Sequence, residues 1–228
     1  MQCSVNALGP PIIRKLTRQV FRQLLRVIDM DAVLVTHSDN DHYSVPTCRD
    51  LAQVTGVYQS TQYVASLMQQ DGFPAHGHDI GEHFAIGPVR VEVTPADHAW
   101  QNDSPGASDR VFQPEDCCGF WIDTPDGTIW APGDSRLIPD HHLRMPAADA
   151  MLFDFSDSEW HFGLDGAIAM ANAYPDTPLL LYHWGSVDAP DFPPFNADPD
   201  SLPDRVENPE RIQVLAPGEP FVLRRLQS

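Results

Sequence analysis

The sequence has little positive charge and no long hydrophobic run. Its 228 residues hold 14 Lys and Arg against 32 Asp and Glu, a formal net charge of −18 at pH 7, and Lys15 is the only lysine. A surface with this charge repels phosphate backbones and anionic lipids. No window reaches the roughly 18 uncharged apolar residues of a membrane span. We therefore expect a small-molecule substrate, no nucleic-acid partner and no membrane partner, and leave homo-oligomerisation open.

The cysteines form no metal-binding or disulfide pattern. Cys3, Cys48, Cys117 and Cys118 show no C-x-x-C spacing, and the adjacent pair is geometrically awkward to bridge. Reduced thiols, and a first ten residues without a basic or an apolar region, predict a cytoplasmic protein. A chain of this length buries roughly 70% of its unfolded surface, so its core needs no structural metal. We expect one domain over residues 1–228, in which any metal serves chemistry.

Short apolar runs alternate with helical stretches along the chain. An amphipathic pattern over 11–28 predicts an N-terminal helix, within a helical segment over 1–30, and its row of arginines is interpreted as a solvated face. Further helices are expected over 46–54, 61–70 and 164–173, and strands over 32–36, 89–94, 119–123, 128–131, 150–155, 179–182 and 221–223. This order predicts a layered α/β or α+β domain.

Four potential metal ligands lie within six residues directly after the predicted strand 32–36. His37, Asp39, Asp41 and His42 combine imidazole with carboxylate, a set that suits zinc, iron or manganese. Taken alone, the segment is also compatible with an acid-rich solvated turn, which is common in an acidic protein. The choice between the two depends on what the rest of the chain brings to the same place.

Ligand types recur where three later predicted strands end. His98 follows the strand over 89–94, Asp134 follows the hairpin, and His183 follows the strand over 179–182. Strand ends are where side chains from distant parts of a chain converge on one site in sheet-containing folds. The recurrence therefore favours a metal site over a solvated turn.

The order of these motifs resembles the metallo-β-lactamase superfamily, in particular its branch similar to ascorbate-6-phosphate lactonase. The matching pattern is H-x-H/D-x-D-H, a lone histidine, Gly-Asp, and a histidine before glycine, over roughly residues 30 to 225. The resemblance implies an αββα sandwich with a dinuclear metal site along one edge of its two sheets. It implies that His37, Asp39 and His98 hold the first ion, that Asp41, His42 and His183 hold the second, and that Asp134 bridges both.

Two features depart from the pattern of this family. Asp39 stands where the family usually has histidine, which makes the first site harder and more anionic. Zinc remains the first expectation for the two divalent ions, but the change favours manganese or iron relative to an all-imidazole site, or weakens the first site until a single ion binds. Only 36 residues precede His37. We therefore expect the N-terminal strands of the sandwich to be reduced, or the authentic start to lie upstream.

The implied chemistry is hydrolysis of a small-molecule lactone, ester or phosphoester by a metal-bound hydroxide. Two ions about 3.5–4 Å apart lower the pKa of a bridging water toward neutrality. Asp41 would orient this nucleophile, and His161 would donate to a substrate oxygen or act as a general acid, with a structural hydrogen bond as the alternative. No Gly-x-Ser-x-Gly, P-loop or Gly-x-Gly-x-x-Gly motif offers another mechanism.

Three residues beside the predicted ligands are candidate substrate contacts. Tyr43 and Trp184 flank ligands and can wall a pocket, with packing as the equal alternative. Arg136 is the nearest candidate partner for an anion, with a surface role as the alternative. A long loop over Asp188–Pro203, rich in proline and acid, follows the last ligand and can act as a lid.

The remaining histidines are interpreted as surface loop residues. They are His76, His78, His83, His141 and His142.

Two other functions stay open beside the hydrolase. A nuclease or phosphodiesterase is disfavoured by the net charge. A non-catalytic member of the same fold would bind metal for structure or sensing, and Asp39 is the feature in its favour.

Overall fold

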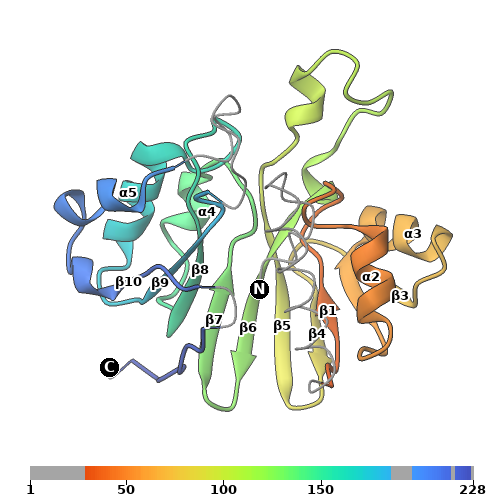
Figure 1. Cartoon of the computed structure of the whole chain (residues 1–228), viewed down its shortest axis with the longest axis horizontal. Helices are drawn as coiled ribbons and strands as arrows, with labels where there is room; N and C mark the ends of the chain where they lie inside the picture. The colour runs from red at the N-terminus through yellow and green to blue at the C-terminus, as the bar shows by residue number, and fades with distance from the viewer. Residues whose placement is uncertain (1–28, 186–196, 217–218, 227–228) are drawn as a thin grey trace.

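Two β-sheets with helices on their outer faces form the described part of the chain, residues 29–185, 197–216 and 219–226, in this computed structural model (Figure 1). The helices are α2 (Val45–Leu51), α3 (Gln62–Gln70), α4 (Pro139–His142) and α5 (Gly163–Ala173), with 3-10 helices η1 (Trp100–Asp103), η2 (Pro114–Asp116), η4 (Pro199–Ser201), η5 (Pro203–Arg205) and η6 (Pro209–Arg211). The strands are β1 (Val33–Leu34), β2 (Tyr58–Thr61), β3 (Ala75–His78), β4 (His83–Ile86), β5 (Val89–Pro95), β6 (Cys118–Thr124), β7 (Gly127–Ala131), β8 (Ala150–Asp154), β9 (Leu179–Tyr182) and β10 (Ile212–Gln213).

The smaller sheet is parallel and the larger sheet is mixed. The first has the order β1-β2-β3, and the second has the order β10-β9-β8-β7-β6-β5-β4. β6 and β7 form the predicted hairpin, with Thr124 paired to Gly127 across the turn Pro125-Asp126. Since β5 and β7 are both antiparallel to β6, and β8 and β9 continue parallel to β7, the carboxyl ends of β5, β7, β8 and β9 lie at one edge.

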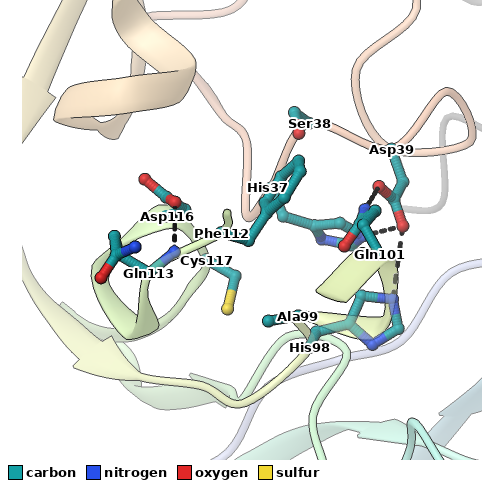
Figure 2. Close-up of a pocket in the computed structure, with 10 residues that line it drawn as sticks. All are labelled: His37, Ser38, Asp39, His98, Ala99, Gln101, Phe112, Gln113, Asp116 and Cys117. Carbon is teal, nitrogen blue, oxygen red and sulfur yellow. Dashed lines mark hydrogen bonds and ion pairs between the residues drawn. The ribbon is translucent and has the colours of Figure 1, made fainter. Parts of the chain in front are cut away.

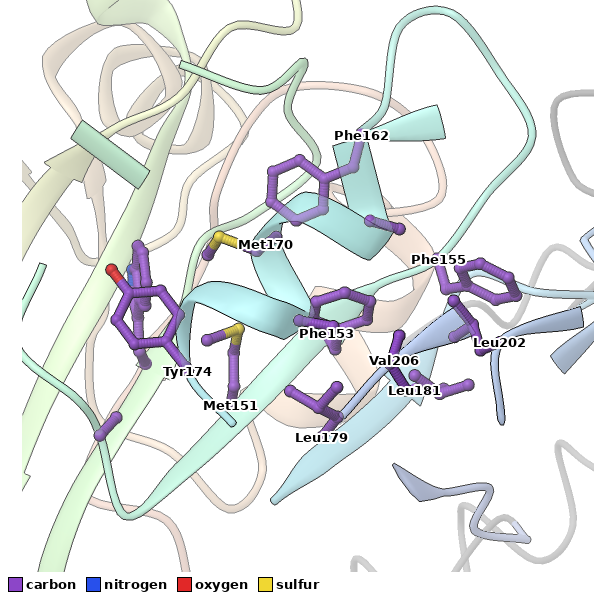
Figure 3. Close-up of a cluster of buried hydrophobic side chains, with 14 residues drawn as sticks. Met151, Phe153, Phe155, Phe162, Met170, Tyr174, Leu179, Leu181, Leu202 and Val206 are labelled. Carbon is purple, nitrogen blue, oxygen red and sulfur yellow. The ribbon is translucent and has the colours of Figure 1, made fainter. Parts of the chain in front are cut away.

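The buried hydrophobic residues form three clusters. One cluster joins α2 and α3 to the smaller sheet around Tyr58 and Met68. A second lies where Leu34 of β1 packs against Val91, Val93 and Phe120 of the larger sheet. The third joins α5 to β7, β8 and β9, and Figure 3 shows its side chains. With α2 and α3 on one side of the strands and α4 and α5 on the other (Figure 1), the predicted αββα sandwich is confirmed.

Most of the helices and strands predicted from the sequence are present in the structure, and the structure also has elements that the sequence did not predict. The strand expected over 221–223 is wrong, because residues 219–226 form no strand and the last one is β10. β2, β3, β4 and α4 were not predicted. β2 has the polar sequence Tyr-Gln-Ser-Thr, yet all four of its residues are buried. The helix expected over 11–28 and residues 188–196 of the expected loop lie outside the described residues.

The histidines outside the site are not all surface loop residues. His76 and His78 belong to β3 and His83 begins β4, and His78 is buried with Nε2 2.7 Å from Oε1 of Gln59. His142 is fully buried in α4, where its Nδ1 accepts a hydrogen bond from the backbone of Ile138, and burial beside His141 lowers its pKa to about 4. The prediction failed because the flanking turns and charges suggested exposure.

No helix in the described part of the chain is long and apolar enough to cross a membrane.

Candidate metal centre

The end of β1 and the carboxyl edge of the larger sheet bring the seven predicted ligands together. The loop after β1 carries the first four, and it is tied to the larger sheet by a 2.9 Å hydrogen bond from the backbone N–H of Cys118 to the carbonyl of Thr36. His98 follows β5, Asp134 follows β7, and His183 follows β9. His37, His98, Asp134 and His183 are buried.

One group of ligands converges on an oxygen of Asp39. Its Oδ2 lies 3.4 Å from Nε2 of His98 and 3.6 Å from Nε2 of His37. Figure 2 shows these three side chains turned toward one another. Two imidazole nitrogens and a carboxylate oxygen at these separations surround a space that a cation can occupy.

A second group converges on Asp134. Its Oδ2 lies 2.9 Å from Nε2 of His42 and 3.2 Å from Nε2 of His183, and His183 Nε2 is also 3.5 Å from Oδ2 of Asp41. Each group therefore contains two imidazoles and one terminal carboxylate.

Asp134 belongs to both groups. Its Oδ2 lies 4.0 Å from Nε2 of His37 as well as beside His42. Asp134 gathers with Asp41, His42 and His183 in one set, and with His37 and His98 in another, each with ligand atoms within 4.8 Å of one another. A carboxylate in this position can bridge two ions.

The hydrogen bonds around the histidines fit a metal. Thr36 Oγ1 lies 2.9 Å from Nδ1 of His37 and 3.1 Å from Nδ1 of His42, and Nδ1 of His98 donates to the carbonyl of Trp160 at 2.8 Å. With the proton on Nδ1, each neutral ring presents the lone pair of Nε2. Nε2 of His37 is buried and has no hydrogen-bond partner among the described residues. These residues therefore fit divalent ions.

Asp39 is held from outside the site by η1. Trp100 Nε1 donates to Oδ2 at 2.6 Å and Gln101 Nε2 donates to Oδ1 at 2.7 Å. Both carboxylate oxygens are thus fixed before any ion arrives. Sequence reasoning missed both donors, because a tryptophan and a glutamine after His98 carry no ligand signal of their own.

Burial and charge shift the pKa values of the site in opposite directions. Burial alone would raise the pKa of Asp134, but His42 and His183 beside it hold that pKa well below its usual range. Burial alone would lower the pKa of His98, but the hydrogen bond to Asp39 and the charge of Asp134 raise it to about 9. Burial and the neighbouring His42 lower the pKa of His37. The site without ions therefore holds an ionised Asp134 against a protonated His98, whereas His37 favours its neutral form.

Two residues with left-handed backbone dihedral angles help to position the predicted ligands. His183 has φ 71°, which is uncommon for a residue other than glycine and concentrates at functional sites. Gly133 has φ 75°, and a Cβ there would lie 2.5 Å from the carbonyl oxygen of Cys118. Only glycine fits this turn, which directs Asp134 into the site.

His161 lies against the ligands and pairs with a buried carboxylate. Its ring centroid is 4.4 Å from that of His183 and 4.9 Å from that of His98. Its Nδ1 lies 2.8 Å from Oδ2 of Asp154, which is fully buried at the end of β8. Asp154 was not singled out from the sequence.

The three candidate substrate residues have other partners. Tyr43 is buried in the cluster under α2, and its hydroxyl donates to Asp71. Arg136 forms two hydrogen bonds with Asp97, at 2.9 and 3.0 Å, and lies over the ring of Trp160. Trp184 packs against the cluster around α5. Packing, the alternative given for Tyr43 and Trp184, describes their contacts, and a role of these three residues in substrate binding stays a prediction.

Similarity to known proteins agrees with the fold. Residues 3–184 match the model of the beta-lactamase superfamily domain. The chain belongs to this superfamily. A UPF0173 metal-dependent hydrolase of Pelotomaculum thermopropionicum is 27% identical over 204 residues, covering 86% of this chain and 84% of that protein.

Two solved structures share the fold of this chain at low sequence identity. Igni18, a metallo hydrolase from Ignicoccus hospitalis, has a TM-score of 0.65 at 19% identity, covering 84% of this chain and 78% of its own. An isothiocyanate hydrolase from Delia radicum gut bacteria has a TM-score of 0.64 at 18% identity, covering 87% and 79%.

Proposed function

We propose that this protein is a metal-dependent hydrolase that binds two divalent ions and cleaves a small-molecule lactone, ester or phosphoester. The observation that carries the proposal is the position of Asp134, whose carboxylate belongs to both ligand groups. The names of the UPF0173 relatives as metal-dependent hydrolases support the same class of activity. His37, Asp39 and His98 hold one ion, Asp41, His42 and His183 hold the other, and zinc is the first candidate for both.

The chain positions the reacting groups around the ions. When bound, a pair of divalent ions supplies a nucleophile from water at neutral pH and polarises the electrophilic oxygen. Asp41 is the most exposed of the three carboxylates, since its side chain is 24% exposed against 17% for Asp39 and 1% for Asp134. Both oxygens of Asp39 already accept hydrogen bonds from η1. An oxygen of Asp41 therefore accepts the proton of the attacking water.

His161 serves as the general acid that protonates the leaving group. Asp154 accepts the hydrogen bond from its Nδ1, and this contact fixes the orientation of the ring. The proton on Nε2 is then delivered to the leaving oxygen. This role differs from that of the ligands, because His161 is not needed to hold either ion.

Metal analysis combined with a substrate panel tests the proposal. Protein purified without chelator is expected to retain two ions per chain and to hydrolyse at least one member of a panel of lactones, carboxylic esters and phosphoesters. Asp134→Asn should lose ions and turnover while keeping its circular dichroism spectrum, and the exposed Asp123→Asn serves as the control. Bound ions without turnover of any panel member would favour the non-catalytic alternative.

A further inference from the structure

A pocket adjoins the first ligand group on the side of η1 and η2 (Figure 2). It is narrow, because its space of about 220 Å³ includes open solvent and its interior has room for about one water-sized group. His37, Asp39 and His98 line it, so a group bound here lies beside the first ion position. Only a group as small as a hydroxyl or an N–H therefore fits inside it.

The wall of this pocket carries no free charge apart from the ligands. The carboxylate of Asp116 is paired by two hydrogen bonds with Arg110 and accepts another from the backbone N–H of Gln113. Burial raises the pKa of the Cys117 thiol to about 12, so this side chain is neutral. None of the ten lining residues is lysine or arginine. An uncharged group therefore suits the pocket better than a phosphate.

The side-chain oxygen of Gln101 is a hydrogen-bond acceptor to which no donor is bound among the described residues. Its Nε2 must face Asp39 Oδ1, 2.7 Å away, because an ionised carboxylate only accepts hydrogen bonds. Its Oε1 lies on the opposite side of the amide in Figure 2. This oxygen is buried and has no hydrogen-bond partner among the described residues, and Gln101 is one of the residues that line the pocket. A buried acceptor left unpaired costs free energy that an incoming donor recovers.

We infer that this pocket receives the part of the substrate next to the scissile bond, where Gln101 Oε1 accepts a hydrogen bond from an uncharged hydroxyl or amide N–H group. The inference rests on the proposed function, since the ions would hold the scissile group beside His37. It narrows the substrate class to small neutral acyl compounds with a donor near the reacting carbonyl, in preference to phosphoesters. Gln101 then determines specificity.

Binding of two matched neutral probes to the zinc-loaded full chain tests the inference without turnover. Glycolamide offers hydroxyl and amide donors, whereas 2-methoxy-N,N-dimethylacetamide offers none. We expect glycolamide to shift the side-chain amide signals of Gln101 in ¹⁵N–¹H NMR spectra. It should bind at least about fivefold more tightly than the methoxy compound, as one hydrogen bond to a buried acceptor implies.

Two variants separate the acceptor from the support of Asp39. Gln101→Met should abolish the preference for glycolamide, whereas Trp100→Phe, which removes the other donor to Asp39 but keeps Oε1, should retain it, both at saturating zinc. Equal binding of the two probes, unmoved Gln101 signals, or an unchanged preference in Gln101→Met would overturn the inference and would mean that Oε1 meets only water. Failure of the wild type to bind zinc would instead refute the proposed function.

Discussion

Nε2 of His42 lies 2.9 Å from Oδ2 of Asp134, although 92 positions of sequence separate the two residues. The contact joins the loop after β1 to the loop after β7, and so joins the two sheets at the site. It also places the candidate bridging carboxylate against both ligand groups. The predictions below follow from this arrangement and from the residues that hold it in place.

Metal binding should release protons. In the ion-free site the pKa of His98 is raised to about 9, so its ring is protonated at pH 7.5, and the carboxylates beside His42 and His183 raise the pKa values of these rings as well. An ion binds only the neutral imidazole, and binding should therefore release at least one proton at that pH, and fewer as the pH rises past 9. Calorimetric titration with zinc in buffers of different ionisation enthalpy measures this number. Release of no protons would contradict the assignment.

The same raised pKa predicts how the ion-free fold responds to pH. A protonated His98 stabilises the folded state below its ordinary pKa of 6.5, and this contribution is lost as the pH rises through the folded value of about 9. Unfolding by urea in EDTA should thus show stability falling between pH 6.5 and 9. His98→Gln should flatten this part of the profile. Stability that rises with pH over that range would contradict a His98 pKa raised by the Asp39 and Asp134 carboxylates.

Removing one hydrogen-bond donor to Asp39 should weaken the binding of the first ion. Trp100→Phe keeps an aromatic ring but deletes the 2.6 Å hydrogen bond to Oδ2, and loss of such outer hydrogen bonds costs about 10- to 100-fold in metal affinity. Competition with a chromogenic chelator should show one weakened site and one unchanged site. The control is Trp121→Phe, a tryptophan of β6 outside the site. Equal loss at both sites would indicate general disruption of the fold.

His161→Asn should slow turnover without removing ions. The variant deletes the proton donor beside His183 but no proposed ligand, so kcat should fall by about 10²- to 10⁴-fold while the metal content stays at the wild-type value. Asp154→Asn should reproduce part of this loss, because it removes the carboxylate that orients the ring of His161. If His161→Asn lost an ion instead, the Asp154, His161 and His183 cluster would be a metal site in its own right.

The turn before Asp134 should tolerate no side chain. Gly133→Ala combines φ 75° with a Cβ 2.5 Å from a carbonyl oxygen, so it should destabilise the protein by roughly 2 kcal/mol or more. Gly166→Ala, inside α5 with its nearest neighbours at 3.5 Å, should stabilise by about 0.5–1 kcal/mol. Chemical denaturation of both variants measures the contrast. Equal stability of the two would show that the turn is not constrained.

The strands before the predicted ligands follow local apolar patterns and could be predicted from them, whereas the αββα arrangement and the set of seven ligands were implied by the resemblance to the metallo-β-lactamase superfamily. Apolar runs such as Leu179–Tyr182 end at polar residues, and strand ends converge for topological reasons. The structure accordingly brings all seven predicted ligands together.

The outer partners of the ligands could not be predicted, since they depend on tertiary contacts between residues with ordinary sequence surroundings. Gln101 and Trp100 reach Asp39 across 61 or more positions, and Asp154 meets His161 only after β8 and the following loop fold back. The same reason applies to His142, whose burial depends on packing against Trp130 and Phe162.

The most direct measurement is the number of ions that each chain binds, by mass spectrometry of the native protein at saturating zinc, compared with Asp134→Asn. The account predicts two ions in the wild type, and a loss in the variant that affects both ion positions, because one carboxylate serves both groups. Two ions retained by Asp134→Asn with unchanged affinity, or none bound by the wild type, would contradict the dinuclear centre from which the proposed hydrolysis follows.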